Sequence, residues 1–137
     1  MDFQNLAYAL AQIVHNFGAV LVVGAAAAAL WLVPRQSTHE RSLAWLVLLG
    51  WMAQIISGAG LGAISYYYYG RFPDITGVAT VALVLKVASA GLGSLLAALY
   101  LLRAARWSDA TRQRIWRTLT GLGVLALTAA AFLRWFS

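Results

Sequence analysis

Four long apolar runs, separated by short polar linkers, constrain this chain more than any other feature of its sequence. A helix needs about 20 consecutive apolar residues to cross the hydrocarbon core of a bilayer. Runs of at least that length lie at about 6–33, 43–67, 77–102 and 115–135. Of the 137 residues, 62% are hydrophobic and only 10% are charged, whereas soluble domains carry about a quarter charged residues. We therefore predict an all-α fold, in which residues 1–137 form a single integral-membrane domain built as a four-helix bundle.

The distribution of arginines predicts the orientation of this bundle. Seven of the nine arginines lie in 34–42 and 103–117, whereas the 66–76 linker and the C-terminal end hold one each. Loops rich in Lys and Arg stay on the cytoplasmic side of a membrane. Both termini are then expected on the non-cytoplasmic side, with the first and third spans parallel, in a multi-pass protein of the bacterial inner (cytoplasmic) membrane. This placement accounts for the net charge of +6 without a nucleic acid partner.

Lys86 is the only lysine, and it lies inside the third apolar run. A helical wheel groups it with small residues: Ala79, Ala82, Ser89, Ala90, Gly93 and Ala97. The opposite face carries larger ones: Val81, Val84, Leu92, Leu95 and Leu99. Small residues mark the faces on which membrane helices pack. We therefore predict that Lys86 points into the bundle and that Gly93 lies at a close helix contact.

The state of Lys86 has two interpretations. Its long side chain can reach back toward the surface as an interfacial anchor. Alternatively, since a buried lysine, unlike an arginine, can lose its proton, Lys86 is a neutral amine that acts as a ligand or proton acceptor. The four acidic residues all lie outside the spans or at their ends, so no internal carboxylate is expected to pair with it. That favours the neutral amine, or a bound anion.

His15 lies at a similar depth in the first span, on a face with Tyr8, Gln12, Ala19 and Val22, while Asn16 is expected to point elsewhere. Since the first and third spans are parallel, we predict that His15 and Lys86 lie close together, across a cofactor or a small polar cavity. A hydrogen-bonded histidine between helices is the simpler alternative, but ionisable residues inside a membrane often mark functional sites. His39, in the 34–42 linker, is about 30 Å or more along the chain and is expected to be solvated.

A histidine and a neutral lysine that face each other suit a flat metal-containing cofactor, and imidazole is a common axial ligand of haem. We therefore predict haem b as the cofactor, with His15 as metal ligand and Lys86 as second ligand or catalytic proton acceptor. The arginines of the cytoplasmic linkers would anchor propionates or lipid phosphates. Met52 is an alternative ligand to Lys86 or, more simply, fills the core. Copper is a poor fit because the chain has no cysteine.

Two segments carry a family resemblance: the span-one histidine followed by "GAVLVVG", and "LVLKVASAGLGSLLAALYLLR" in span three. They look like the CopD-type copper-resistance membrane domain and are similar to HemJ-type (protoporphyrinogen oxidase-like) four-span proteins. "LVPRQSTHE" resembles the "LPR…H" segment of the latter. The resemblance covers the four-span architecture and implies roles for His15 and Lys86 in haem b binding and oxidase activity.

Three function classes stay open at this point. The first is a haem-b redox protein, either an electron carrier or a porphyrinogen oxidase. The second is a non-catalytic subunit or assembly factor of a larger respiratory or metal-handling complex. The third is a small dimeric transporter or anion channel. The expected partners are the lipid bilayer and a second copy of the chain or a larger membrane complex.

Overall fold

The computed structural model describes residues 2–34 and 37–136 and consists of four long helices. They are α1 (Phe3–Trp31), α2 (Thr38–Tyr69), α3 (Val78–Arg103) and α4 (Asp109–Phe136), with a short 3-10 turn at Ala104–Arg106 before α4. Each of the four is long and apolar enough to cross a membrane. The predicted all-α, four-span architecture is therefore confirmed, and the chain is a multi-pass membrane protein.

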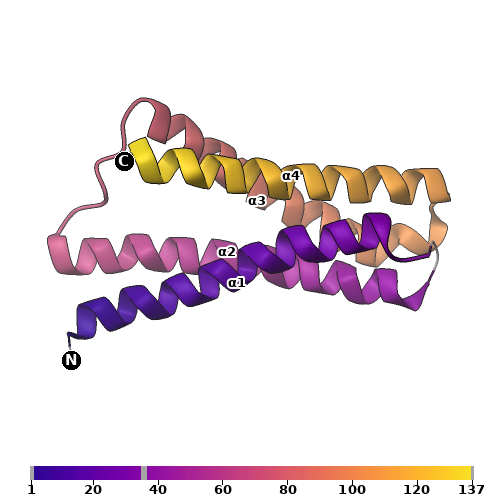
Figure 1. Ribbon diagram of the computed structural model, residues 1–137, viewed down its shortest axis with the longest axis horizontal. Coiled ribbons are helices and arrows are strands. Elements are labelled where there is room, and N and C mark those ends of the chain that lie inside the picture. Colours follow the sequence, from indigo (N-terminus) through magenta and orange to yellow (C-terminus); the bar gives the residue numbers. More distant parts are fainter. Residues whose placement is uncertain (1, 35–36, 137) are drawn as a thin grey trace.

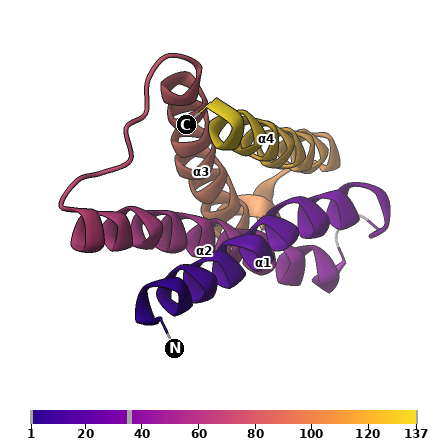
Figure 2. The same cartoon turned by 60° about the vertical axis from the view of Figure 1, so that its left-hand side comes forward.

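The helices run alternately up and down, so that both described ends of the chain lie at the same end of the bundle (Figure 1). We call this end the terminal end, and the end with linkers 32–37 and 104–108 the linker end. The helices form two pairs, α1 with α2 and α3 with α4, and these pairs contain the most extensive packing. The pairs approach each other at the linker end and diverge toward the terminal end (Figures 1 and 2). That the termini share one end agrees with the prediction, while their placement outside the cytoplasm stays a prediction.

Two helices begin earlier than the apolar runs indicate, because polar residues at their starts are also helical. α2 begins at Thr38 rather than near 43, and α4 begins at Asp109 rather than near 115. At the start of α4 the Ser108 hydroxyl accepts a hydrogen bond from the Thr111 backbone N–H at 3.3 Å, whereas Ser37 before α2 makes no such side-chain bond. Hydropathy therefore located each span but not the polar first turns of α2 and α4.

The predicted faces of α3 are confirmed. The buried residues of this helix are Ala79, Ala82, Ser89, Ala90, Gly93, Ala97, Tyr100 and Leu101. On the opposite face, Val81, Val84, Leu92 and Leu95 are more than half exposed, as expected for side chains that contact lipid. Since small side chains let helices approach closely, the buried stripe of α3 packs directly onto the rest of the bundle.

Two close approaches of the backbone fix the helices beside the cavity described below. α1 and α2 cross at Gly18 and Gly50, where a Cβ atom on Gly50 would lie 2.9 Å from Leu21 Cβ. α2 and α3 meet where the Trp51 ring lies over Gly93, and a Cβ on Gly93 would lie 2.3 Å from that ring. The prediction of a close helix contact at Gly93 is thus confirmed.

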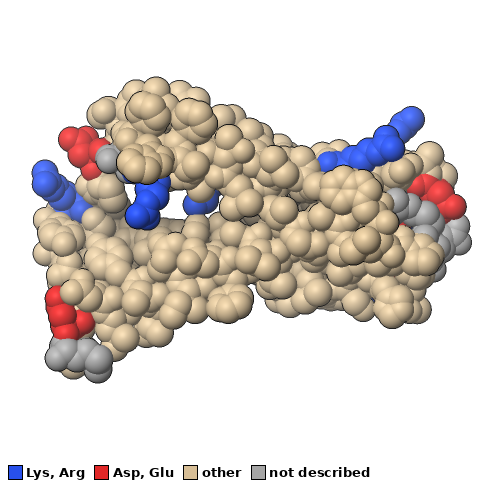
Figure 3. Space-filling view, viewed as in Figure 1, with Lys and Arg blue, Asp and Glu red and all other residues tan. Residues whose placement is uncertain are grey.

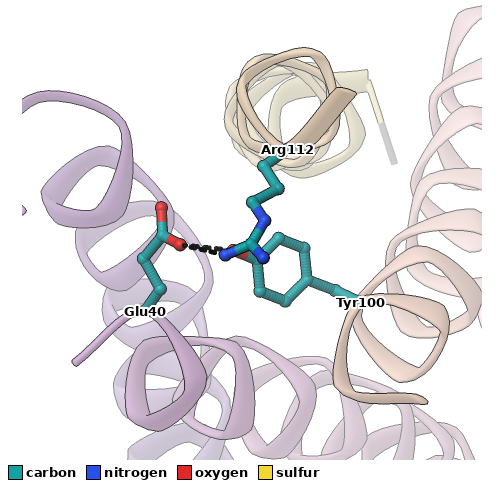
Figure 4. A network of polar contacts seen from close by, with 3 residues as sticks. All are labelled: Glu40, Tyr100 and Arg112. Carbon is teal, nitrogen blue, oxygen red and sulfur yellow. Dashed lines mark hydrogen bonds and ion pairs between the residues drawn. The ribbon is translucent and has the colours of Figure 1, made fainter. Parts of the chain in front are cut away.

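A polar cluster joins three helices at the linker end. Glu40 accepts a hydrogen bond from the Tyr100 hydroxyl at 2.8 Å, and it forms an ion pair with Arg112 Nη1 at 3.4 Å (Figure 4). Glu40 lies in the first turn of α2, at the end of the span as expected, but it is only 2% exposed. This carboxylate is buried because α2 begins early and brings it between α3 and α4, and there its charge is balanced by Arg112.

Candidate functional site

Lys86 and His15 meet inside the bundle, although they come from α1 and α3, which lie in different helix pairs. Lys86 Nζ and His15 Nε2 are 2.8 Å apart, a hydrogen-bond distance, and both side chains are partly buried. The prediction that the two residues lie close together is confirmed. They are in direct contact, however, rather than on opposite sides of a gap, and both line the wall of a cavity.

The surroundings of His15 determine which of its ring nitrogens carries a proton. His15 Nδ1 lies 2.8 Å from Ser57 Oγ, and Ser57 Oγ also lies within hydrogen-bond distance of the backbone carbonyl of Ala53. With its hydroxyl hydrogen on that carbonyl, Ser57 Oγ accepts from the imidazole, and this arrangement places the hydrogen on Nδ1. Nε2, the atom that faces Lys86, then has the lone pair of the neutral ring.

The hydrogen bond between Lys86 and His15 holds one proton. Lys86 can donate to the Nε2 lone pair as an ammonium or as a neutral amine, or an imidazolium N–H can donate to a neutral amine. The pair therefore carries one positive charge or none, since two fully protonated groups would repel each other at this distance. The described part of the chain contains one ion pair, Glu40–Arg112, so no carboxylate is paired with Lys86 or His15 there.

The backbone beside His15 is held by α2. The Gln54 side chain donates a hydrogen bond from Nε2 to the backbone carbonyl of His15. Gln54 and Ser57 lie one turn apart on α2, just past the Gly18–Gly50 crossing. This crossing brings α2 close enough for two of its polar side chains to fix both the main chain and the ring of His15.

A cavity of about 590 Å³ opens next to the pair. Its walls come from all four helices, and Figure 3 shows an opening between the two helix pairs, on the half of the molecule nearer the terminal end, with basic side chains at its edge. The polar residues that line it are Gln12, His15, Asn16, Gln54, Lys86 and Arg134. A cavity of this size falls in the range that accommodates small molecules and cofactors.

Several expectations about individual residues need correction. Asn16 does not point away from the site: it lines the cavity and accepts a hydrogen bond from Gln12 at 2.8 Å. Met52 is 36% exposed, so it does not fill the core; it is not among the cavity-lining residues, and its role as a haem ligand stays a prediction. His39 is exposed in the first turn of α2, as predicted.

The described arginines near the linker end do not reach the site. Arg41, Arg103, Arg106, Arg112, Arg114 and Arg117 are absent from the residues that line the cavity, and Arg35 lies outside the described residues. Arg134, from the last turn of α4, lines the cavity instead. In the sequence Arg134 looks like an ordinary end-of-span residue, and only the divergence of the helix pairs brings it to the cavity.

Comparison with known proteins adds no relative: the chain matches no protein-family model, and no similar curated protein or solved structure was found. The function must therefore be argued from the site itself.

Proposed function

We propose that this protein binds haem b in the cavity beside His15 and uses it as a redox cofactor in the membrane. The observation that carries the proposal is the contact between His15 Nε2 and Lys86 Nζ in the wall of this cavity. It supplies two nitrogen donors at the edge of a ligand-sized space. The resemblance of the His15 and Lys86 segments to HemJ-type proteins points to the same cofactor.

The donor atoms suit a metal that brings most of its own ligands. Among the described residues, no group of three or more His, Cys, Asp and Glu is placed to hold a metal ion. A bare ion would find too few ligands in this cavity. A haem iron is already held by its macrocycle and needs only one or two axial donors, for which imidazole is a common choice.

Ser57 and Gln54 prepare His15 for this role. Because Nδ1–H is donated to Ser57 Oγ, the lone pair that can bind iron is at Nε2, on the cavity side. A hydrogen bond at the other ring nitrogen also fixes the orientation of a ligating imidazole and raises its basicity. The chain thus presents a preoriented axial ligand.

In this proposal Lys86 holds and releases a proton. If His15 were to hold haem through Nε2, that nitrogen would no longer accept a hydrogen bond from Lys86, and the amine would be free to hold or release a proton at the cavity. Haem supplies the one-electron chemistry. A lysine in an apolar bundle can exchange its proton near neutral pH, which an arginine cannot do, so Lys86 suits a proton acceptor in an electron carrier or a porphyrinogen oxidase.

An open ion pathway is less well supported. The second cavity, of about 230 Å³, lies at the linker end and shares no lining residue with the first. Between them the core is filled by buried side chains, among them Trp51, Val47 and Ala97. We therefore favour a binding site over a channel.

An absorption spectrum tests the proposal. Protein purified in detergent from haem-replete cells is expected to show a Soret band that the His15→Ala variant loses. The His39→Ala variant is the matched control, since His39 is exposed in the first turn of α2 and its loss should leave the band unchanged. Colourless wild-type protein, or a full Soret band in His15→Ala, would contradict the proposal.

A further inference from the structure

The basic side chains that line the cavity indicate which kind of ligand it binds. Lys86 and Arg134 are the basic side chains among its lining residues, and no carboxylate lines it. Neither residue forms an ion pair within residues 2–34 and 37–136. A cationic group in a low-dielectric site is favoured when an anion is close to it, so a ligand that carries negative charge is complementary to this cavity.

The cavity is also graded in polarity along the helix axes. On α1 the lining begins with Gln12, His15 and Asn16 near the terminal end and continues with Ala19, Val22 and Val23. On α4 it runs from Gly123, Ala126 and Leu127 at the deep end to Arg134 near the mouth. The stretch from Gly123 to Arg134 corresponds to about 16 Å at 1.5 Å per residue.

The deep end is closed by close packing of α1 and α4. A Cβ atom on Gly123 would lie 3.1 Å from side-chain atoms of both Val22 and Val23. The opening in Figure 3 lies between the helix pairs on the terminal half of the molecule, so a ligand that enters there places its apolar part against the aliphatic residues. Its polar part then lies among the amides and the two basic side chains.

From these features we infer that the cavity binds an amphiphile through a carboxylate held by Arg134, with Lys86 as a second hydrogen-bond donor. The inference rests on the proposed function because it concerns the same cavity, and it names the residue that recognises the acidic group of the ligand. Arginine suits this task because its planar guanidinium donates two parallel hydrogen bonds to one carboxylate. A neutral ligand of the same shape leaves Arg134 without a partner.

Metal-free protoporphyrin IX and its dimethyl ester provide the test, because they differ in charge and hardly in shape, and neither contains iron. Binding to the detergent-purified protein is followed by porphyrin fluorescence. We expect the free acid to bind at least about 10-fold more tightly than the ester, since a hydrogen bond to a charged group is worth that much. Arg134→Gln should remove most of this preference, and Arg134→Lys should restore part of it.

Two further variants separate this inference from the proposed function. Arg117→Gln changes an exposed arginine on the same helix near the linker end, and should leave the preference for the acid intact. His15→Ala should lose the Soret band of haem-loaded protein and keep part of the preference for the acid, because Arg134 stays in place. If haem is not bound but the acid still binds better than the ester in an Arg134-dependent way, the inference stands and the proposed function fails.

Palmitate tests whether the cavity also binds a carboxylate that is attached to an alkyl chain instead of a porphyrin. Arg134-dependent binding of palmitate without any porphyrin binding would support the carboxylate inference and again count against haem. Equal affinity for the acid and the ester, or an Arg134→Gln variant that keeps its folded state and the full preference, would overturn the inference. So would the failure of all three probes to bind.

Discussion

At the scale of single residues, the chemistry of the site depends on hydrogen-bond acceptors that lie on a different helix. His15 is placed by α1, but its tautomer is set by Ser57 and Ala53 of α2. Lys86 is placed by α3 and shares a proton with His15. The pair is thus tuned by the position of one hydroxyl group, which makes Ser57 the residue to change first.

Ser57→Ala should release His15 from its fixed tautomer. The variant leaves Nδ1–H without its acceptor, and we expect a loss of about 1–2 kcal/mol in stability and a mixture of two neutral tautomers. The ¹⁵N chemical shifts of the His15 ring report the tautomer directly. Thr128→Ala is the matched control, because the Thr128 hydroxyl bonds only to a carbonyl of its own helix and is exposed. An unchanged ¹⁵N spectrum in Ser57→Ala would show that Ser57 does not set the tautomer.

We expect the substitution Lys86→Arg to be nearly as damaging as Lys86→Met. Arginine keeps the positive charge but does not give up its proton, and its larger planar group does not fit the 2.8 Å contact with His15 Nε2. Haem content of the purified variants, measured against wild type, should therefore fall in Lys86→Arg nearly as far as in Lys86→Met. If Lys86 is only an interfacial anchor, Lys86→Arg will behave like wild type, because arginine also reaches the surface.

Part of this site could be predicted from the sequence and part could not. His15 and Lys86 were identifiable because ionisable side chains are rare inside apolar runs, and the parallel direction of α1 and α3 placed them together. Ser57, Gln54 and Asn16 carried no such signal, since neutral polar residues are common in membrane helices. Their roles depend on the Gly18–Gly50 crossing, which hydropathy does not encode. The cofactor roles of His15, Lys86 and Met52 stay predictions.

At the scale of helices, packing relies on small residues that leave room for large ones on the neighbouring helix. The buried stripe of α3 was predictable because its small residues recur with the period of a helix. The residue that covers Gly93 was not, because the partner of a small residue depends on the crossing of two helices. Trp51, 1% exposed, takes that place.

Gly93→Ala should destabilise the bundle, since the new methyl group would lie 2.3 Å from the Trp51 ring and the ring has little space to move. We expect a loss of about 1–3 kcal/mol from overpacking, and a larger one for Gly93→Leu. Gly91→Ala is the control within the same helix, because nothing lies within 4 Å of a Cβ there. Thermal unfolding in detergent compares the two variants. Equal melting temperatures would show that α2 and α3 do not meet at Gly93.

The Glu40 cluster predicts a second loss of stability at the linker end. Arg112→Gln removes the positive charge beside a carboxylate that is 2% exposed, and breaking such a pair costs of the order of 3 kcal/mol. The double variant Glu40→Gln/Arg112→Gln should recover a large part of this loss, because it leaves no uncompensated charge. Arg114→Gln, an exposed neighbour on α4, serves as control. Denaturation in detergent that is the same for Arg112→Gln and Arg114→Gln would contradict this account.

At the scale of the whole molecule, the four spans and the shared end of the two termini followed from the apolar runs and the short linkers. The divergence of the helix pairs did not, because hydropathy describes each helix and not the angle between pairs. The sequence placed seven arginines in the linkers 34–42 and 103–117, and the structure gathers these linkers at one end (Figure 1). Which side of the membrane that end faces is open to experiment.

The positive-inside rule predicts that the linker end faces the cytoplasm. A C-terminal alkaline phosphatase fusion should therefore be active, because the enzyme folds only outside the cytoplasm, and a C-terminal green fluorescent protein fusion should be dim. Fusions within linker 104–108 should give the opposite pattern and provide the internal control. A bright fluorescent fusion together with an inactive phosphatase at the C-terminus would reverse the orientation.

The divergence of the two helix pairs determines from which leaflet of the bilayer a ligand reaches the cavity. Since the pairs part only toward the terminal end, the cavity opens in the half of the bundle that lies in one leaflet, and α1 and α4 pack closely at its deep end, where Gly123 meets Val22 and Val23. In the orientation that the arginines predict, this is the outer leaflet. An acidic amphiphile made in the cytoplasm would then have to flip across the membrane before loading. Occupancy of the site would thus follow the composition of the outer leaflet, and not the total amount of ligand in the cell.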